Sequence, residues 1–315
     1  MITTAVAFAS VPHRAHEGRS IIMRASAYSI ERKQFGLFPT RARRVRFSST
    51  PLSSAAHSQG GGHTRLPQEL IADHHGSKRV VWNMDTLDWL DGRVQLDMPV
   101  RYNIITSIPD ISELGTRRQR VDAEDYEDWF IEVVSKIMNV LPDDNVAIFY
   151  QTPGRSSGIG GSWLDKGHLC QLGARSAGAR CVWQKIALDG PPGIERAGRP
   201  GFVNMLCFSK QHALPSSADG ASRFKTVDVL YRGSMSYRKA MGEEACMEAV
   251  SYCEHWVDGK FSSQRAVVDP FCGHGSVLAA ANRSGASAYG LDLSAECCRL
   301  ALSYPFKPRV QRGKS

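Results

Sequence analysis

The 315-residue sequence predicts an α/β protein in which one doubly wound sheet forms a single catalytic domain. Strand-like β-branched or apolar runs alternate with segments of helical periodicity along most of the chain, which is typical of this class. Hydrophobic residues make up 42% of the sequence, enough to bury a sizeable core. Near the C-terminus, residues 267–278 have the form of a nucleotide-binding strand–turn–helix junction.

The expected elements follow from the period of the apolar residues. A helix is expected over 123–140, because its large apolar residues recur at helical spacing, at Trp129, Phe130, Val133, Val134 and Ile137. Further helices are expected at 86–90, 166–177 and 241–254. Strands are expected at 79–82, 102–106, 146–151, 180–186, 202–209 and 266–268.

The positive charge is concentrated at the N-terminus. Residues 1–60 hold nine basic and two acidic residues, whereas the rest of the chain holds 30 basic and 29 acidic residues, so its bulk charge gives no sign of a polyanionic partner. Because residues 1–60 are rich in Ser, Ala and Arg, they are typical of an organelle transit peptide, mitochondrial or alternatively plastid. An N-terminal extension without targeting information is the alternative. We expect a linker at 61–78 and one catalytic domain at 79–315.

The cysteines and the hydropathy pattern narrow the function classes. The eight cysteines include no C-x-x-C pair, so we expect no zinc site and reduced thiols in an intracellular compartment. No run approaches 18 consecutive apolar residues, so we expect no membrane-spanning helix. The oligomeric state cannot be inferred from these features.

The C-terminal junction reads Asp269-Pro-Phe-Cys-Gly-His-Gly-Ser-Val-Leu278. Its glycines, Gly273 and Gly275, allow a tight turn and let a ligand lie against bare backbone. Asp292 follows 17 residues after Gly275 at the end of the next expected strand, where an acid can bind ribose hydroxyls. Position 278 is Leu where a dinucleotide fingerprint has its third glycine, which argues against a nicotinamide cofactor.

This string resembles the cofactor motif of class I methyltransferases that act on exocyclic amines of nucleobases. The resemblance implies S-adenosylmethionine as cofactor. Asp292 would hold its ribose, and the loop would bind its methionine part through Asp269, Phe271, Cys272, Gly273 and Gly275.

The position of the junction predicts a circular permutation. Only 47 residues run from Asp269 to Ser315, whereas each βα unit needs about 30 or more, so the catalytic half must come first. Residues 82–87 and 103–110 resemble the opening of the permuted amino-methyltransferases, and the likeness extends over 79–303. It implies a Rossmann-like class I sheet with the catalytic strand before the cofactor-binding strand. In that family the counterpart of Asp85 bonds the adenine amine; a surface turn is the alternative for Asp85.

One motif departs from the family. The chain has Ser107-Ile-Pro109-Asp110 where the family has Ser, Asp or Asn, then Pro-Pro and an aromatic residue. The resemblance makes Ser107, Pro109 and Asp110 the catalytic candidates, but Asp110 cannot stack on an extruded base. Asp110 would instead accept a hydrogen bond or a proton from the substrate, or only cap the helix that follows.

The expected activity is therefore methyl transfer to an amine of a nucleobase in organellar RNA. A DNA base is the second possibility, and a protein or small-molecule amine the third. Trp163 and Lys166 would stack on a substrate ring and contact phosphate, or pack as ordinary loop residues. A catalytically inactive, methyltransferase-like RNA-binding or assembly subunit is the rival interpretation, because the Ser107–Asp110 motif is altered.

Overall fold

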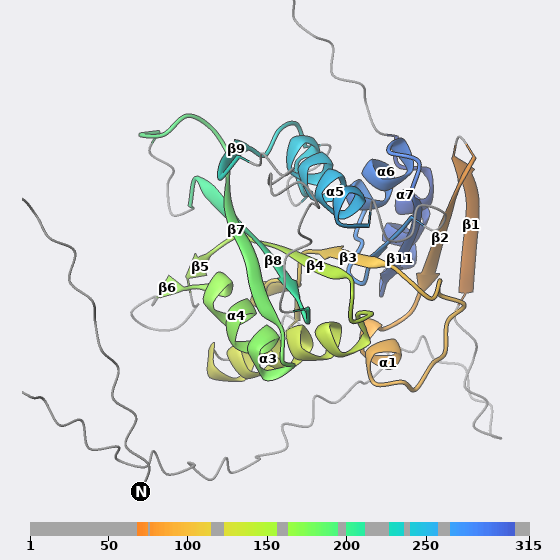
Figure 1. Ribbon diagram of the computed structural model, residues 1–315, viewed down its shortest axis with the longest axis horizontal. Coiled ribbons are helices and arrows are strands. Elements are labelled where there is room, and N and C mark those ends of the chain that lie inside the picture. Colours follow the sequence, from red (N-terminus) through yellow and green to blue (C-terminus); the bar gives the residue numbers. More distant parts are fainter. Residues whose placement is uncertain are drawn as a thin grey trace, which may run out of the picture. The chain divides into compact units, whose positions relative to one another are not determined.

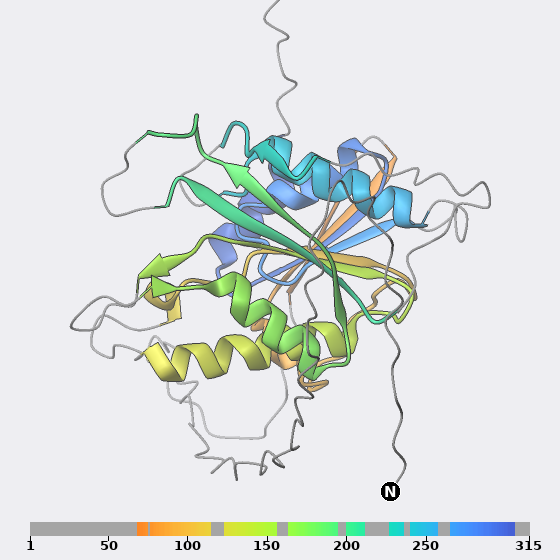
Figure 2. The ribbon, with the colours of Figure 1, turned by 60° about the vertical axis from the view of Figure 1, so that its left-hand side comes forward.

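The computed structural model describes residues 68–74, 76–114, 123–155, 163–194, 200–211, 227–235, 240–257 and 265–305, all within the compact unit that begins at Leu52. The expected transit segment, 1–60, lies outside the described residues. The described chain forms a nine-stranded mixed sheet with helices on both faces (Figures 1 and 2). In sheet order the strands are β1 (Gln68–His74), β2 (Ser77–Asn83), β11 (Ser287–Asp292), β10 (Ala266–Asp269), β3 (Asn103–Thr106), β4 (Val146–Gln151), β8 (Phe202–Ser209), β7 (Arg180–Leu188) and β9 (Val229–Tyr231).

The strand order confirms the predicted permutation. The C-terminal strands β10 and β11 lie between the N-terminal strands β2 and β3, and all three of these contacts are parallel (Figure 1). β4 continues the parallel set beside β3, whereas β8 runs antiparallel between β4 and β7. The chain thus has a Rossmann-like sheet, with its cofactor-type junction late in sequence and central in space.

Two helical layers cover the sheet. One core cluster joins the sheet to α1 (Thr86–Leu90), α3 (Ala123–Val140) and α4 (Lys166–Ser176), and the other joins it to α5 (Glu243–Val257), α6 (Ser276–Arg283) and α7 (Ala295–Ser303). Figure 2 shows these layers on opposite faces. α3 keeps the bounds expected from its periodicity, with Phe130, Val134 and Ile137 fully buried. No helix in the described ranges is long and apolar enough to cross a membrane.

Five elements did not follow from the sequence pattern. Residues 68–74, placed in the linker, form β1, which pairs antiparallel with β2 through a turn at Gly76. β9 has three residues, and β5 (Gly154–Arg155) and β6 (Trp163–Leu164) have two each, too short for any periodicity. The four-residue helix α2 (Ile111–Leu114) directly follows the Ser107–Asp110 turn.

Arg79 joins the first half of the sheet to the last two helices. Its side chain, on β2, is buried at 2% exposure, and Nε donates to Asn282 Oδ1 of α6 at 2.6 Å. Nη1 donates to three carbonyl oxygens at the end of α7, of Ala301, Leu302 and Tyr304, at 3.0–3.2 Å. The carbonyls of the last turn of an α-helix point out of its C-terminal end, so the guanidinium caps α7. Burial lowers the pKa of Arg79 to about 10, which still leaves it charged at neutral pH.

Replacing Arg79 by Met should therefore destabilise the fold by about 3 kcal/mol or more, since the guanidinium's hydrogen bonds to three carbonyls and to the Asn282 side-chain oxygen are lost. Urea unfolding followed by circular dichroism measures the change. Arg175→Met, at an exposed position in the last turn of α4, is the matched control. A loss at Arg79 no larger than at Arg175 would contradict the role assigned to this contact.

Candidate active site

The cofactor-type loop and the Ser107–Asp110 turn leave the same edge of the sheet. β10 and β3 are adjacent and parallel, with Val267 opposite Asn103, so the segments that follow them begin side by side. The hydroxyl of Thr106, the last residue of β3, donates to Asp269 Oδ1 at 2.7 Å. In open α/β sheets the crevice outside the carboxyl ends of the strands is where ligands bind.

Asp269 holds the start of the loop. Its side chain is 4% exposed and accepts hydrogen bonds from Thr106 and from the Phe271 amide, the latter at 3.2 Å. Burial raises the pKa of Asp269 to about 7, while both hydrogen bonds act to lower it. The carboxyl group therefore fixes the start of the loop through hydrogen bonds, and its burial leaves little surface that a ligand could contact.

The two glycines of the loop have different reasons to be glycine. Gly273 and Gly275 both have positive φ, 50° and 86°. At Gly275 a Cβ atom would also lie 2.7 Å from the Cα of Ala301 in α7, so packing against that helix, rather than a ligand, excludes a side chain. The Cys272 side chain is buried in the α5–α7 core, and Phe271 packs against the opposite cluster. The loop therefore offers a ligand mainly its backbone.

Asp292 closes the loop from the neighbouring strand. Its Oδ2 accepts from the Gly273 amide at 3.0 Å, and its Oδ1 accepts from the Ser294 amide at 2.8 Å. Burial raises the pKa of Asp292. A carboxylate accepts about four hydrogen bonds, so two backbone bonds leave capacity for two hydroxyls of a ribose. Leu293, 75% exposed, places an apolar side chain next to this acid.

Asp85 lies near Asp292 because β2 and β11 end together. The Asn83 side-chain amide donates to the Asp292 carbonyl oxygen at 3.1 Å, and the Thr86 hydroxyl donates to the Pro270 carbonyl. Asp85 itself is the N-cap of α1 and accepts from the Leu87 amide at 2.9 Å. The sequence left open whether Asp85 is a turn residue or a ligand contact. In the structure Asp85 caps α1 at the edge of the sheet where Asp292 lies, a position compatible with both roles.

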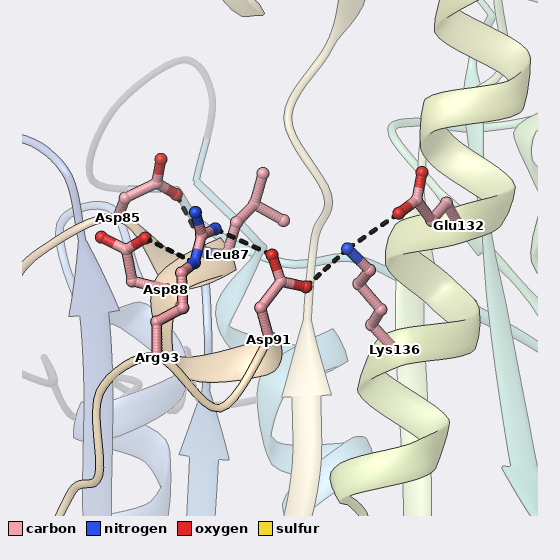
Figure 3. A network of polar contacts seen from close by, with 7 residues as sticks. All are labelled: Asp85, Leu87, Asp88, Asp91, Arg93, Glu132 and Lys136. Carbon is pink, nitrogen blue, oxygen red and sulfur yellow. Dashed lines mark hydrogen bonds and ion pairs between the residues drawn. The ribbon is translucent and has the colours of Figure 1, made fainter. Parts of the chain in front are cut away.

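An ion-pair relay fixes α1 against α3 (Figure 3). Asp91, which ends α1, accepts from Arg93 at 2.8 Å and from Lys136 of α3 at 2.6 Å, and Lys136 also meets Glu132 at 2.8 Å. These groups are partly exposed, so the relay orients α1 more than it stabilises the fold.

The Ser107–Asp110 turn points its polar groups outward. Ser107 is exposed, whereas Ile108 is 2% exposed and anchors the turn in the α3 layer. The Tyr126 hydroxyl donates to the Pro109 carbonyl at 2.9 Å. The turn is thus held against the α3 layer by the buried Ile108 side chain and by the Tyr126 hydroxyl.

The Asp110 carboxylate forms an ion pair with Lys166, the first residue of α4. The side chain of Asp110 is 50% exposed and that of Lys166 is 4% exposed. The backbone amide of Asp110 donates to Glu113 Oε2 at 2.8 Å. The structure therefore gives the Asp110 side chain a lysine partner in place of the amide that a capping aspartate would bind.

Two residues at this edge, Thr106 and Tyr126, had no sequence signal. Their hydrogen bonds to Asp269 and to the Pro109 carbonyl join segments that only the fold brings together. Lys166 was expected to contact phosphate or to pack as a loop residue; it is buried and paired, whereas Trp163 is 53% exposed. Among the residues that the structure describes, no group of three or more His, Cys, Asp or Glu side chains is arranged to hold a metal ion.

Comparison with known proteins identifies the fold. No protein-family profile and no curated protein sequence matches the chain. Among solved structures, the PvuII DNA methyltransferase, described as cytosine-N4-specific, is 13% identical and aligns over 71% of this chain and 84% of its own, with a TM-score of 0.50. A putative DNA modification methylase from Thermus thermophilus, solved with S-adenosyl-L-methionine, is 18% identical over 69% of this chain and 88% of its own, with a TM-score of 0.49. The chain has the fold of the class I, amino-methyltransferase type.

The buried Asp269 carboxyl predicts a pH-dependent stability. Its folded pKa of about 7 lies above the unfolded value of about 3.9, so between these pH values the folded state holds a proton that the unfolded state has lost. The contribution of Asp269 to the free energy of unfolding is fully present below about pH 4. It is lost as the pH rises through about 7, and the loss is on the order of a few kcal/mol. Asp269→Asn removes this component.

Urea unfolding of wild type and Asp269→Asn at several pH values between 4 and 8 tests it. The difference in unfolding free energy should move in favour of the variant as pH rises. Asp128→Asn, at an exposed acid of α3, is the reference. A difference that stays constant with pH would show that Asp269 is ionised throughout.

Proposed function

We propose that this protein binds S-adenosylmethionine and transfers its methyl group to an exocyclic amine of a nucleobase in organellar RNA. One observation carries the proposal: the turn after β3 and the glycine loop after β10 leave adjacent parallel strands and are joined by the Thr106–Asp269 hydrogen bond. Methyl transfer needs donor and acceptor atoms to approach to about 3–3.5 Å, and this junction brings the two candidate binding segments to one place.

The residues present suit the cofactor. Gly273 has no side chain to exclude a ligand from the loop backbone, and Asp292 retains capacity for ribose hydroxyls. Leu293 supplies an exposed apolar surface beside that acid, suited to the flat face of an adenine. Bound there, S-adenosylmethionine supplies an electrophilic methyl group on a sulfonium.

The Ser107–Asp110 turn would orient the acceptor. The Ser107 hydroxyl is exposed and can accept a hydrogen bond from the amine. The acceptor nitrogen forms the new N–C bond as the C–S bond breaks, the electron pair goes to sulfur, and the nitrogen loses a proton. The half-exposed Asp110 carboxylate, held by Lys166, is the group placed to take that proton.

The substrate class follows from what the turn lacks. Without an aromatic residue at position 110 the turn itself supplies no stacking surface for a base flipped out of a duplex, which favours an acceptor already single-stranded, as in RNA. The basic, Ser- and Ala-rich composition of residues 1–60 supports a mitochondrial or plastid address. A DNA base remains the second candidate, because the PvuII protein of similar fold is described as a DNA methyltransferase.

The test is transfer of labelled methyl groups from S-adenosylmethionine to organelle RNA purified from cells lacking the protein. Digestion to nucleosides and mass spectrometry then identify the modified base. Asp110→Asn should lower the rate about 10²-fold, because the proton acceptor is lost.

Glu113→Gln is the matched control, since a carboxamide oxygen still accepts the Asp110 amide. Labelling of DNA but not RNA would move the assignment to the second candidate. Tight cofactor binding without transfer to any nucleic acid would favour an inactive RNA-binding or assembly subunit.

A further inference from the structure

Gln151, the last residue of β4, is a buried amide without a hydrogen-bond partner. Its side chain is 1% exposed, and neither Nε2 nor Oε1 has a partner within the described part of the chain. Leaving such a group unpaired costs about 1–3 kcal/mol per donor or acceptor. Buried polar atoms in folded proteins nearly always form hydrogen bonds. The unpaired amide of Gln151 is therefore a candidate to form its hydrogen bonds with a bound ligand.

Gln151 belongs to the candidate active site by position. The parallel register sets Thr106 opposite Phe149, so Gln151 is level with Ile108 in the Ser107–Asp110 turn. Side chains alternate along a strand, and Phe149 packs in the cluster that contains α3 and α4. Gln151, two residues further on, lies on that same face.

A series of neighbouring residues connects Gln151 to Asp110. Gln151 is opposite Asn204 on β8, which is also buried. A Cβ atom on Gly167 would lie 3.2 Å from Asn204 Nδ2, so the first turn of α4 lies against this pair of strands. Gly167 follows Lys166, whose ammonium pairs with Asp110. Gln151, Asn204 and Lys166 are buried, whereas the Asp110 side chain is 50% exposed, so the series meets solvent at the Ser107–Asp110 turn.

A carboxamide presents one donor and one acceptor in a plane. That pattern matches a base edge on which an exocyclic amine stands next to an unprotonated ring nitrogen, as Gln or Asn matches adenine in nucleic-acid recognition. Oε1 accepts from the amine and Nε2 donates to the ring nitrogen. On their Watson–Crick sides, adenine and cytosine both have such an edge. Guanine has a protonated ring nitrogen beside its amine there, and uracil has a carbonyl in place of the amine.

We propose that Gln151 is a specificity-determining residue of the acceptor site, and that its amide pairs with the amine and ring nitrogen of an adenine or cytosine base. This inference rests on the proposed function, whose acceptor it narrows to two bases. An apolar residue of similar shape at position 151 abolishes the discrimination while sparing the fold, because an unpaired amide contributes no native hydrogen bond to lose.

Binding of AMP, CMP and UMP tests the proposal, by calorimetry with and without saturating S-adenosylhomocysteine. Wild type should bind AMP or CMP about 10-fold or more tightly than UMP, the effect of one good bidentate pair. Gln151→Met should remove this preference, leave affinity for S-adenosylhomocysteine unchanged, and leave the urea midpoint equal or higher. Gln151→Leu repeats the test with a second apolar side chain, and Gln171→Met, at an exposed glutamine of α4, is the matched control.

A wild type without base preference, or a preference that survives both substitutions, overturns the proposal. So does clear destabilisation by both substitutions, because it would show that the amide serves the fold. Failure of the wild type to bind S-adenosylhomocysteine contradicts the proposed function instead, and the titrations without that ligand still decide the role of Gln151.

Discussion

The hydrogen bond between Thr106 and Asp269 marks the contact on which the site depends. It joins the ends of β3 and β10, strands that are neighbours in space but far apart in sequence. Because both strands run parallel, their following segments emerge at one edge of the sheet. The buried Asp269 carboxyl also holds the Phe271 amide, so one side chain fixes the end of β3, where the Ser107–Asp110 turn begins, relative to the cofactor-type loop.

The permuted order makes demands that the rest of the fold meets. Strands β10 and β11 lie between β2 and β3 in the sheet, although the other strands all precede them in sequence. The Arg79 side chain connects the earlier half to α6 and α7, and the Asn83 amide ties the end of β2 to that of β11. The backbone geometry of the glycine loop is in turn supported by α7, since Gly275 packs against Ala301.

Much of this architecture could be predicted from the sequence. The junction at 269–275 and the acid at 292 have a distinctive spacing, and the motif at 103–110 that precedes them in sequence resembles the opening of the permuted amino-methyltransferases. α3 was predicted to the residue because its apolar stripe is long and regular. By contrast, β1 was placed in a linker and β9 was missed, because edge strands with few buried side chains carry no strong pattern.

The candidate site was predictable only where a local motif exists. Asp292 and the glycines follow from such a motif, but the partners of Asp110 do not, because Lys166 lies 56 residues away and is brought near by α4. For the same reason no sequence pattern distinguishes Gln151 from an ordinary strand-end glutamine. Its burial and lack of partners emerge only from the packing of β8 and α4 around it.

Where the family pattern has an aromatic side chain, this chain has a carboxylate paired with a buried lysine. The change exchanges a stacking surface for charge and hydrogen-bonding capacity at the mouth of the site. With the buried Gln151 amide, it makes this edge of the sheet polar. In the proposed function, recognition at this edge depends on hydrogen bonds more than on stacking.

Hydrogen–deuterium exchange with and without S-adenosylhomocysteine tests the central claim most directly, because it reports on both segments in one measurement. If the loop after β10 and the turn after β3 form one site, the ligand should slow exchange in peptides covering 270–276, 290–294 and 107–114 together. Slower exchange in 270–276 and 290–294 with 107–114 unchanged would show that the Ser107–Asp110 turn is not part of the ligand site, and would contradict the account.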